Sequence, residues 1–449
     1  MSGDDIAAFM AEHPQLRSVT VAVCDVNGAF RGKRLPLAQI EKIADGGFRM
    51  PLSAVTLDIW GRDIEGSALV FASGDADGVC SMTGRGVLLS TWLSEPTAMI
   101  PVWMNREDGS PFPIDPRRAL AMVLDRYAAK GLRPVVATEL EFYLTEPGGE
   151  RPRRPKSPMT GERLHSDEIL SVSELDGFSA FLDDVYAACA IQDIPVDSAI
   201  SEGGAGQFEI NLLHTDDPLK AADDSVLFKR LVRGVARKHG FAATFMAKPF
   251  GDGAGNGMHV HFSVLDRDGN NIFDNGGPEG SQALLHAVGG LLATMHENTL
   301  VFAPHQNSYR RISPGSHAPT GASWGYENRT AAIRIPGGDN KARRIEHRLA
   351  GADVNPYLSM AAILGGALLG MEQEIEPLEP LTGNAYEAEI PSLPLDWPSA
   401  IAAFEEGEYA SQIFDPKLQQ LFAQTKQQEL KRFSETVTRF EYQTYLEVV

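Results

Sequence analysis

The stretch NRTAAIRIPGGDNKARRIEHR, residues 328–348, ends in three charged side chains spaced two apart, Arg344, Glu346 and Arg348. On a β-strand this spacing places all three on one face. The planar fork of arginine pairs well with phosphate and carboxylate, so the cluster favours a bound polyanion. The alternative is a solvated edge strand with surface ion pairs.

Three other stretches alternate in the same way: ELEF (139–142), QFEINL (207–212) and HVHFS (259–263). A sheet packs through an apolar face, so their polar faces are expected to point to solvent or into a wet interior site. The residue types are those of ligands and anion binders rather than the Lys, Thr and Ser of a solvated strand. The polar members are Glu139, Glu141, Gln207, Glu209, Asn211, His259, His261 and Ser263.

The carboxylates of these stretches, with that of Glu202, would repel one another if they were gathered without cations. Carboxylates with an occasional imidazole suit Mg²⁺ or Mn²⁺ rather than zinc, and such ions commonly clamp nucleotide phosphates. The alternative is ordinary surface charge. The sequence contains no Walker-type GxxxxGK[ST] and no GxGxxG motif.

The net charge of −20 argues against nucleic acid and against anionic membrane surfaces as partners. The three cysteines, Cys24, Cys80 and Cys189, form no CxxC pair, which fits a reducing compartment without structural zinc. The N-terminus is acidic where a signal peptide is basic, and the longest apolar run is too short to cross a bilayer. We therefore expect a soluble, cytoplasmic protein.

The order of elements favours a mixed, mostly antiparallel α+β catalytic domain over residues 106–449, after a small strand-rich domain over residues 1–105. Asp115 is expected to cap a helix with Pro116 in its first turn, and Ser173 to open another. A hairpin is expected at Asn27-Gly28, and a mobile loop over 146–168. Helices are expected at 35–46, 115–130, 173–190, 217–239, 281–300, 355–375, 397–406 and 415–434. Strands are expected at 17–25, 98–106, 133–144, 206–213, 241–248 and 257–266, and towards the end of 50–61.

These motifs occur in the order found in the glutamine synthetase family, which the chain resembles over nearly its full length. The matching stretches are ELEF (139–142), EGGAGQFEINL (202–212), NGMHVHFS (256–263), NSYRRISPG (307–315), NRTAAIRIP (328–336), ARRIEHR (342–348) and NPYL (355–358). Within the family the chain looks most like the γ-glutamylpolyamine synthetase, or glutamate–putrescine ligase, branch. That likeness lies in LDIWGRDIEG (57–66), PFPIDPRRAL (111–120), ASWGYENRT (322–330) and RIEHRLAGADVNPYL (344–358).

The resemblance implies an N-terminal β-grasp domain and a catalytic domain whose curved antiparallel sheet forms a bifunnel. It implies double-ringed homo-oligomers, often dodecamers, in which the N-terminal domain of one subunit completes the active site of its neighbour. It also implies the chemistry: ATP phosphorylates the γ-carboxylate of glutamate, and an amine displaces phosphate from the acyl phosphate.

The resemblance further implies roles for single residues, with two to three metal ions in each site. Ligands of the metal nearer glutamate would be Glu141, Glu202 and Glu209, and ligands of the metal on the ATP phosphates would be Glu139, His259 and Glu346. The nucleotide would contact His261, Ser263, Lys341 and Arg344. Glutamate would be bound by Arg311, Arg348 and Gly255, and the transferred phosphoryl group steadied by Arg329 and Arg334.

Two departures from the family lie on the amine side. The PG-x-E segment reads Pro314-Gly315-Ser316-His317, and an Asp-Gly-Ser-Ser loop is replaced by MPLSAVTL (50–57). Losing two anions is expected to weaken an ammonium site and to make room for a larger amine. His317 is a candidate general base, the alternative being a loop histidine without a catalytic role. A third departure is Ala254, where the family usually has asparagine.

The sequence therefore predicts an ATP-dependent ligase that joins glutamate to an organic amine, with a polyamine such as putrescine as the favoured acceptor. Asp58, Asp63 and Glu65 could hold the distal ammonium of a diamine, and Trp324 its aliphatic stem; the alternative is surface charge and a core tryptophan. Other acceptors in play are a monoamine such as methylamine or ethanolamine, and ammonium. The alternative outside enzymes is a catalytically silent structural or regulatory relative.

Overall fold

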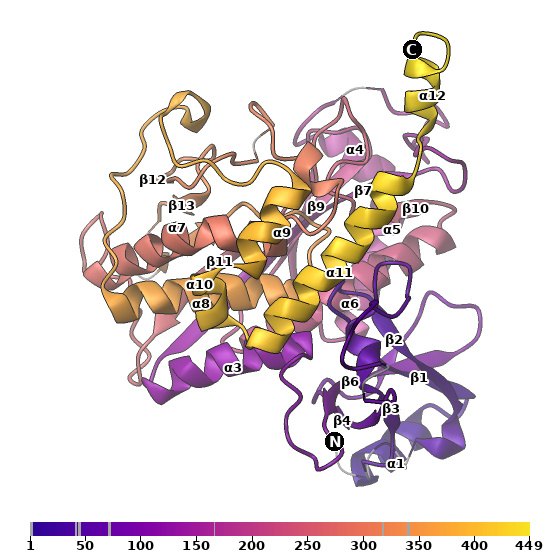
Figure 1. Ribbon diagram of the computed structural model, residues 1–449. Coiled ribbons are helices and arrows are strands. Elements are labelled where there is room, and N and C mark those ends of the chain that lie inside the picture. The colour runs from indigo at the N-terminus through magenta and orange to yellow at the C-terminus, as the bar shows by residue number, and fades with distance from the viewer. Residues whose placement is uncertain are drawn as a thin grey trace.

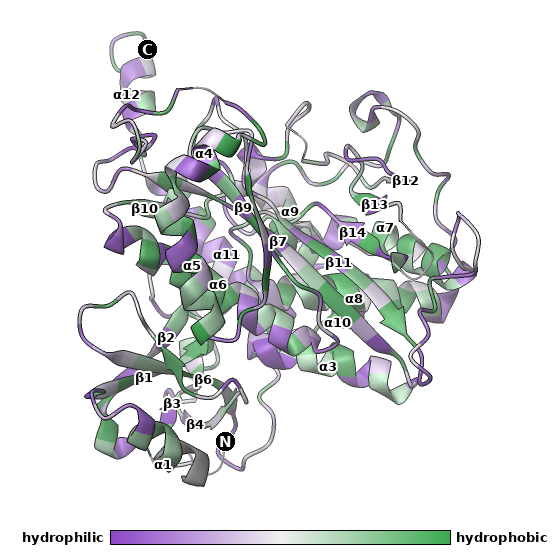
Figure 2. Ribbon diagram, turned by 180° about the vertical axis from the view of Figure 1, so that it is seen from behind, coloured by the Kyte–Doolittle hydropathy of each residue, from purple (hydrophilic) through white to green (hydrophobic). Residues whose placement is uncertain are grey.

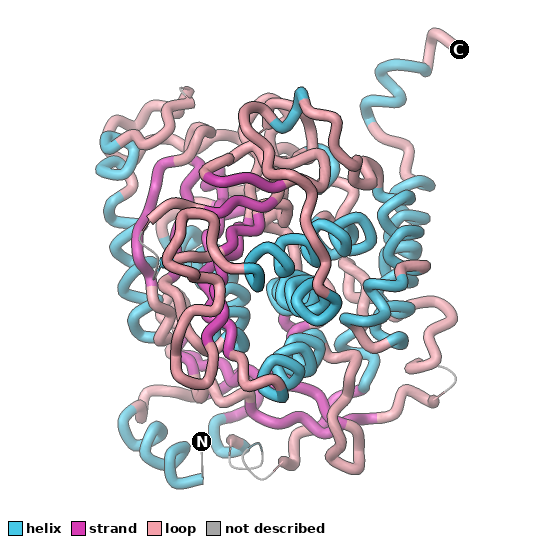
Figure 3. The backbone as a smooth tube through the Cα atoms, turned by 90° about the vertical axis from the view of Figure 1, so that its left-hand side faces the viewer, coloured by secondary structure: helices cyan, strands magenta, loops and turns pink. Residues whose placement is uncertain are grey.

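The computed structural model describes residues 3–40, 43, 46–70, 73–165, 167–316, 318–338 and 342–449. Its strands form two sheets, a smaller one from the first quarter of the chain and a larger one from the rest (Figure 1). A quarter-turned view shows the smaller sheet below the larger one, near the N-terminus (Figure 3).

The smaller sheet has the strand order β2-β1-β6-β4-β3, with β5 paired to β6. The predicted hairpin is confirmed, because β1 and β2 pair antiparallel around Asn27-Gly28. The strand expected within 50–61 is wrong, because a 3₁₀ turn occupies residues 52–55. The elements are α1 (Gly3–Glu12), β1 (Ser18–Cys24), β2 (Phe30–Pro36), β3 (Arg49–Pro51), β4 (Asp77–Met82), β5 (Leu88–Leu89) and β6 (Thr97–Asn105). The expected helix at 35–46 lies partly outside the described residues.

The larger sheet has the order β12-β13-β14-β11-β7-β9-β8, with β10 paired to β7. Its pairings are antiparallel except for β12 with β13, which confirms the predicted mixed and mostly antiparallel sheet. Its strands are β7 (Arg133–Thr145), β8 (Val196–Ser201), β9 (Gln207–Leu212), β10 (Ala242–Thr244), β11 (Met258–Leu265), β12 (Trp324–Tyr326), β13 (Ile333–Ile335) and β14 (Ile345–His347). The domain boundary at 105/106 stays a prediction, since a single buried core runs through both sheets.

Most predicted helices form close to their expected bounds. Asp115 caps α3 through the amides of Arg117 and Arg118, as expected. The described helices after α1 are α3 (Pro116–Ala129), α4 (Val172–Gly177), α5 (Ser179–Ile191), α6 (Pro218–Lys238), α7 (Gln282–Phe302), α8 (Pro356–Gln373), α9 (Trp397–Glu405), α10 (Glu408–Ile413), α11 (Pro416–Glu435) and α12 (Arg439–Tyr445). None of them is long and apolar enough to cross a membrane.

The helix expected at 173–190 is instead two helices, and its predicted cap is wrong. The N-cap of α4 is Ser171 and not Ser173, because the side chain of Ser171 accepts the backbone amide of Glu174. The break falls at Phe178, whose ring is buried 5.3 Å from that of Phe208. Burial of this ring against the sheet outweighs the unbroken helical pattern of the sequence.

The loop 146–168 is mostly exposed among its described residues, as expected of a surface loop. Lys156 and Arg163 form a β-bridge, and Pro155 and Ser157 are buried, so the loop is anchored near its middle. Its mobility stays a prediction.

One face of the larger sheet is apolar and packs on helices. Phe142 of β7 contacts Phe181 of α5 and Phe228 of α6 through ring edges. Green, apolar ribbon runs along α8 and the neighbouring strands (Figure 2). Because alternate residues point to opposite faces, this packing leaves the polar side chains of the same strands on the other face.

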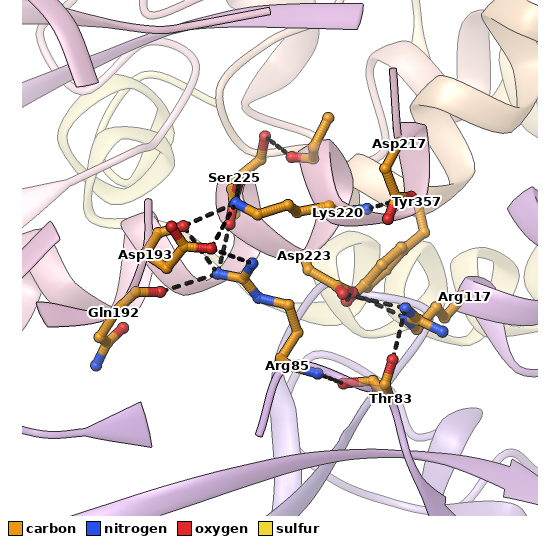
Figure 4. Close-up of polar contacts among 12 residues, drawn as sticks. Thr83, Arg85, Arg117, Gln192, Asp193, Asp217, Lys220, Asp223, Ser225 and Tyr357 are labelled. Atoms are coloured by element: carbon orange, nitrogen blue, oxygen red, sulfur yellow. Dashed lines mark hydrogen bonds and ion pairs between the residues drawn. The ribbon is translucent and has the colours of Figure 1, made fainter. Parts of the chain in front are cut away.

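Buried ion pairs join the smaller sheet to the helices of the larger one (Figure 4). Arg85, between β4 and β5, pairs with Asp224 of α6 at 2.6 Å. Arg117 of α3 pairs with Asp223 at 2.9 Å, and Tyr357 of α8 donates to the same carboxylate at 2.6 Å. Removing one member of such a buried network would leave a charge unpaired, so we expect it to destabilise the contact between the two parts.

Candidate active site

The polar alternations of the sequence come together on neighbouring strands, β14, β11, β7 and β9. In the register of these strands His261 lies opposite Glu346, His259 opposite Glu139, and Glu141 opposite Glu209. Arg344 and Arg348 lie just outside β14, which runs only from Ile345 to His347. The sheet thus gathers on one face side chains that are far apart in the chain.

Glu139 lies between two imidazoles. One carboxylate oxygen is 3.0 Å from Nδ1 of His259, and the other is 2.9 Å from Nε2 of His261. Burial acts to raise the pKa of Glu139, but the hydrogen bonds from both histidines outweigh it and hold the pKa far below its usual value. Glu139 is therefore ionised.

Two groups of possible metal ligands share Glu139. One contains Glu139, Glu209 and His259, and the other contains Glu139, His261 and Glu346; within each group the ligand atoms lie within 4.8 Å of one another. Oxygen and imidazole donors at this spacing fit Mg²⁺ or Mn²⁺. The division differs from the sequence prediction, which placed Glu209 with Glu141 and Glu202 and kept His261 for the nucleotide. Which residues bind each ion stays a prediction.

Crowded carboxylates shift the acidity of two further residues. Burial, with the charge of Glu141, raises the pKa of Glu202 to about 7. Burial and the charges of Glu139, Glu141 and Glu202 raise the pKa of Glu209 well above its usual value. A divalent cation would remove this repulsion, so the donor set fits a bound metal ion.

Glu346 is bracketed by arginines. Arg334 donates to one oxygen at 2.7 Å, and Arg348 contacts the other. Burial acts to raise the pKa of Glu346, but the charge of Arg348 and the nearby histidines lower it to about 2. Glu346 would therefore bind a metal ion only through lone pairs that the arginines leave free, or after one ion pair opens.

Three side chains of the site crowd around Gly257, directly before β11. A methyl group added there would lie 2.7 Å from Nη2 of Arg311, 3.1 Å from Nε2 of His259 and 3.4 Å from Oε1 of Glu141. Arg311 is buried and donates to the carbonyl of Leu349 at 2.8 Å. The absence of a side chain at Gly257 thus lets a predicted glutamate-binding arginine approach two predicted metal ligands. Sequence reasoning missed Gly257, although its place directly before a polar strand was the available signal.

Gly255, predicted to contact glutamate, also lies against Arg311. Its carbonyl accepts from Nε2 of Gln207 at 2.9 Å, and the neighbouring carbonyl of Ala254 accepts from the hydroxyl of Tyr143 at 3.0 Å. The backbone beside the predicted glutamate site is therefore held by side chains of β9 and β7.

A cavity of about 350 Å³ opens beside the metal-ligand groups. It is lined by the predicted nucleotide contacts His261, Ser263 and Arg344, and by Glu139. Sequence reasoning missed Asp197 and His214, which also line it. Asp197 lies on β8, a strand that was not predicted, and His214 follows β9 in a loop without a pattern. The other lining residues are Val135, Ala137, Thr138, Leu212, Leu213, Phe262 and Ala342.

Two other predicted residues, Trp324 and Asp58, have roles away from this cluster. Trp324 is buried, and its indole donates to the carbonyl of Leu378 at 2.6 Å, which fits the core tryptophan of the alternative. Asp58 is buried too, and accepts the amides of Trp60 and Arg62, so it shapes its loop instead of facing an amine. Arg329 is exposed. Its charge opposes the rise in the pKa of Glu202, so it lies near the site. His317 and Lys341 lie outside the described residues.

Carboxylates, imidazoles and arginines on one sheet face, next to a cavity, define a class of site that positions phosphate groups around divalent cations. Such a site catalyses phosphoryl transfer by positioning and charge neutralisation more than by covalent chemistry of its side chains.

A model of the glutamine synthetase catalytic domain matches residues 113–445. The chain is 37% identical over 445 residues to the γ-glutamylputrescine synthetase PuuA of Escherichia coli (strain K12), covering 98% of this chain and 94% of that protein. It is 31% identical to a glutamate–isopropylamine ligase of a Pseudomonas species, covering 98% and 97%. A solved structure of a GmaS/ADP complex superposes with a TM-score of 0.86 at 28% identity, covering 98% and 99%. The chain belongs to the glutamine synthetase family, which confirms the predicted family and its fold.

Proposed function

We propose that this protein is an ATP-dependent ligase that joins the γ-carboxylate of L-glutamate to an organic amine through a γ-glutamyl phosphate. The observation that carries the proposal is the continuous polar face across β14, β11, β7 and β9, beside the cavity lined by His261, Ser263 and Arg344. Relatives of this chain that act on putrescine and on isopropylamine support an organic amine as the acceptor.

The reaction follows from the placement of charges. Arg311 and Arg348 hold the carboxylates of glutamate, while Arg329, Arg334 and Arg344 neutralise phosphate oxygens. A γ-carboxylate oxygen attacks the terminal phosphorus of ATP, and ADP leaves. The amine nitrogen then attacks the acyl carbon, phosphate leaves, and the nitrogen loses a proton, for which His317 is the candidate base. Bound Mg²⁺ or Mn²⁺ supplies further neutralisation of phosphate charge.

A polyamine such as putrescine is the acceptor we favour, and residues 57–66 are the segment proposed to select it. This segment, which we call the acceptor loop, exposes Trp60, Asp63 and Glu65. No ionic partner for either carboxylate lies in the described ranges. An aromatic surface beside free carboxylates suits the stem and the distal ammonium of a diamine.

We also propose that the subunits form a closed oligomer, with a dodecamer as the expected form, in which the acceptor loop of one subunit faces the site of its neighbour. Exposed apolar surface on the loop supports this, because Ile59 and Trp60 are 40% and 39% exposed. Light scattering coupled to size-exclusion chromatography measures the size of the assembly directly.

Phosphate release from ATP, Mg²⁺ and glutamate tests the function when it is measured with ammonium, methylamine, ethanolamine, putrescine and spermidine. We expect the fastest turnover with putrescine or spermidine. If turnover is fastest with a monoamine, the acceptor is a monoamine and not a polyamine. Faster turnover with ammonium than with every organic amine would contradict an organic acceptor. No release with any amine would favour a catalytically silent relative.

Glu346→Ala is the matching variant, because it removes a predicted metal ligand that is 1% exposed. We expect it to abolish phosphate release with every amine. Glu435→Ala removes an exposed carboxylate at the end of α11 and serves as the control with unchanged turnover. Full activity of Glu346→Ala would contradict the placement of the metal site.

A further inference from the structure

A second cavity lies outside the candidate active site and is cationic. It measures about 440 Å³ and is lined by Pro152, Arg153, Arg154, Arg163, Leu164, His165 and Phe250. None of these lining residues is acidic, although the chain carries a net charge of −20. A cavity whose charge opposes that of the whole molecule attracts anions in particular.

Two of its arginines are fixed in place. Arg154 donates to Asp167 at 2.9 Å and lies 5.2 Å from the ring centre of Phe250. Arg163 donates to Glu146 at 2.7 Å and also to the carbonyl of Arg154. Guanidinium groups held in this way lose little side-chain entropy when an anion binds.

Two other basic side chains, Arg153 and His165, also line the cavity. Neither has an ionic partner in the described ranges, and both side chains are exposed at the cavity. The guanidinium of Arg153 carries a positive charge, and the imidazole of His165 can donate a hydrogen bond. The uncompensated charge of the cavity is therefore positive.

We infer that this cavity binds a small polyanion that carries phosphate groups or several carboxylates. The fork of Arg153 would bind two oxygens of the anion, His165 would donate to a third, and Arg154 and Arg163 would add field from their fixed positions. The cavity is of the size that holds a small metabolite.

The cavity is also connected to the candidate active site. The carboxylate oxygen of Asp167 that pairs with Arg154 accepts the amide of Ala205 at 3.2 Å. The ring of Pro155 packs directly on Gly206, where an added methyl group would lie 2.7 Å from it. Both contacts reach the turn 202–206, which begins with Glu202. An anion that draws Arg154 away from Asp167 would therefore alter the carboxylate that accepts the amide of Ala205 in this turn.

Calorimetric titration of the full-length protein with pyrophosphate in metal-free buffer tests the binding. We expect one site, and we expect Arg153→Ala to weaken it by about tenfold or more through loss of a charge-assisted hydrogen bond. Lys156→Ala is the matched control, because Lys156 is an exposed cation of the same segment outside the cavity lining. Arg344→Ala tests whether pyrophosphate binds in the candidate nucleotide cavity instead. A parallel titration with citrate separates phosphate from carboxylate ligands.

The inference is overturned if Arg153→Ala binds as the unchanged protein does, or if Lys156→Ala loses as much affinity, since diffuse surface charge would then explain the binding. It is also overturned if only Arg344→Ala loses the site. Hydrogen exchange tests the connection: pyrophosphate is expected to change exchange in the turn 202–206, in the unchanged protein and in Lys156→Ala but not in Arg153→Ala. Binding without this change would refute the connection. None of these measurements depends on the proposed ligase activity.

Discussion

Asp63 and Glu65 are exposed carboxylates on the acceptor loop, and their charge should matter only to amines with a second positive group. We expect the double variant Asp63→Asn/Glu65→Gln to raise the KM for putrescine by about tenfold, because exposed ion pairs contribute up to about 1 kcal/mol each. The KM for methylamine should stay unchanged, since methylamine has no distal ammonium. Initial rates of phosphate release at varied amine concentration measure both.

The matched control removes equal charge elsewhere on the N-terminal part of the chain. Asp77 and Glu95 are also exposed, and Asp77→Asn/Glu95→Gln should leave both KM values unchanged. An equal rise for methylamine and putrescine in the loop variant would rule out a distal ammonium site.

Gly257 is closely surrounded by the side chains of Arg311, His259 and Glu141. In Gly257→Ala the added methyl group would lie 2.7 Å from Nη2 of Arg311, so the guanidinium must shift. Overpacking of this kind costs about 1–3 kcal/mol, and we expect the KM for glutamate to rise by about tenfold or more. Initial rates at varied glutamate and at varied ATP measure the effect, which should be larger for glutamate.

Gly251→Ala is the control for this variant, because nothing lies within 4 Å of a methyl group at position 251. It should keep the KM of the unchanged protein. A Gly257→Ala protein with an unchanged glutamate KM would show that glutamate binding does not depend on the position of the Arg311 guanidinium.

At the level of elements, helix α11 holds the acceptor loop through several side chains. The amide group of Gln428 donates to a carboxylate oxygen of Asp58 at 3.0 Å and to the carbonyl of Asp63 at 3.1 Å, and its oxygen accepts the amide of Glu65 at 2.8 Å. The ring of Trp60 lies against the guanidinium of Arg432 at 4.2 Å. The loop's shape is therefore set by a helix more than three hundred residues later in the chain.

Gln428→Ala should release the loop without unfolding α11. We expect the amide of Glu65 to exchange with solvent about five- to tenfold faster, as the loss of a hydrogen bond worth about 1 kcal/mol predicts. Gln427→Ala is the matched control, because Gln427 donates only to Glu405 on the surface and should leave the loop unchanged. Hydrogen exchange followed by mass spectrometry reads both, and equal exchange in both variants would show that Gln428 does not hold the loop.

The elements also show which features of the structure can be predicted from the sequence. Alternation in ELEF and HVHFS predicts which side chains share a face, because that follows from the period of a single strand. It does not predict that β7 lies between β11 and β9, because strand order depends on pairings between distant segments. Asp58 looked like a free carboxylate in sequence, and its role in shaping the loop depends on backbone turns that composition does not encode. The place of His214 in the cavity lining could not be predicted either, because His214 follows β9 in a loop without a sequence pattern.

At the level of the whole molecule, a buried pair ties helix α11 to two loops in the N-terminal part of the chain. Lys426 and Glu429 of α11 have fully buried side chains 3.0 Å apart. Lys426 also donates to Asn27, and Glu429 accepts the amide of Ile59 at 2.8 Å. Burial acts to raise the pKa of Glu429, but the charge of Lys426 and the contact with His305 lower it to about 2.

This lowered pKa predicts how stability depends on pH. The unfolded chain protonates Glu429 near its ordinary pKa of 4.5, so the contribution is complete above that pH and is lost as the pH falls towards 2. Its size is about 3 kcal/mol. We expect Glu429→Gln to be less stable at neutral pH and to lose less stability between pH 5 and pH 3 than the unchanged protein, in urea unfolding at a series of pH values.

Lys426→Met/Glu429→Gln is the control for the pair, because it removes the lysine charge that Glu429→Gln leaves buried and unpaired. It should recover part of the stability that the single variant loses at neutral pH. Parallel pH curves for the unchanged protein and Glu429→Gln would show that Glu429 is not the group that titrates.

The order of strands in the larger sheet has a consequence for synthesis of the chain. Glu139 lies on β7 and Glu346 on β14, and β11 separates these strands in the sheet. A ribosome must therefore release every strand of the larger sheet before the metal-ligand group that contains Glu346 is complete, whereas the group of Glu139, Glu209 and His259 is complete once β11 has emerged. Pairings between such distant segments form slowly, and the unpaired edge of β11 is exposed until β14 arrives. Translation products that end before β14 would carry the apolar strands of the larger sheet but would lack Glu346. We therefore expect the nascent chain to depend most on chaperones before β14 emerges.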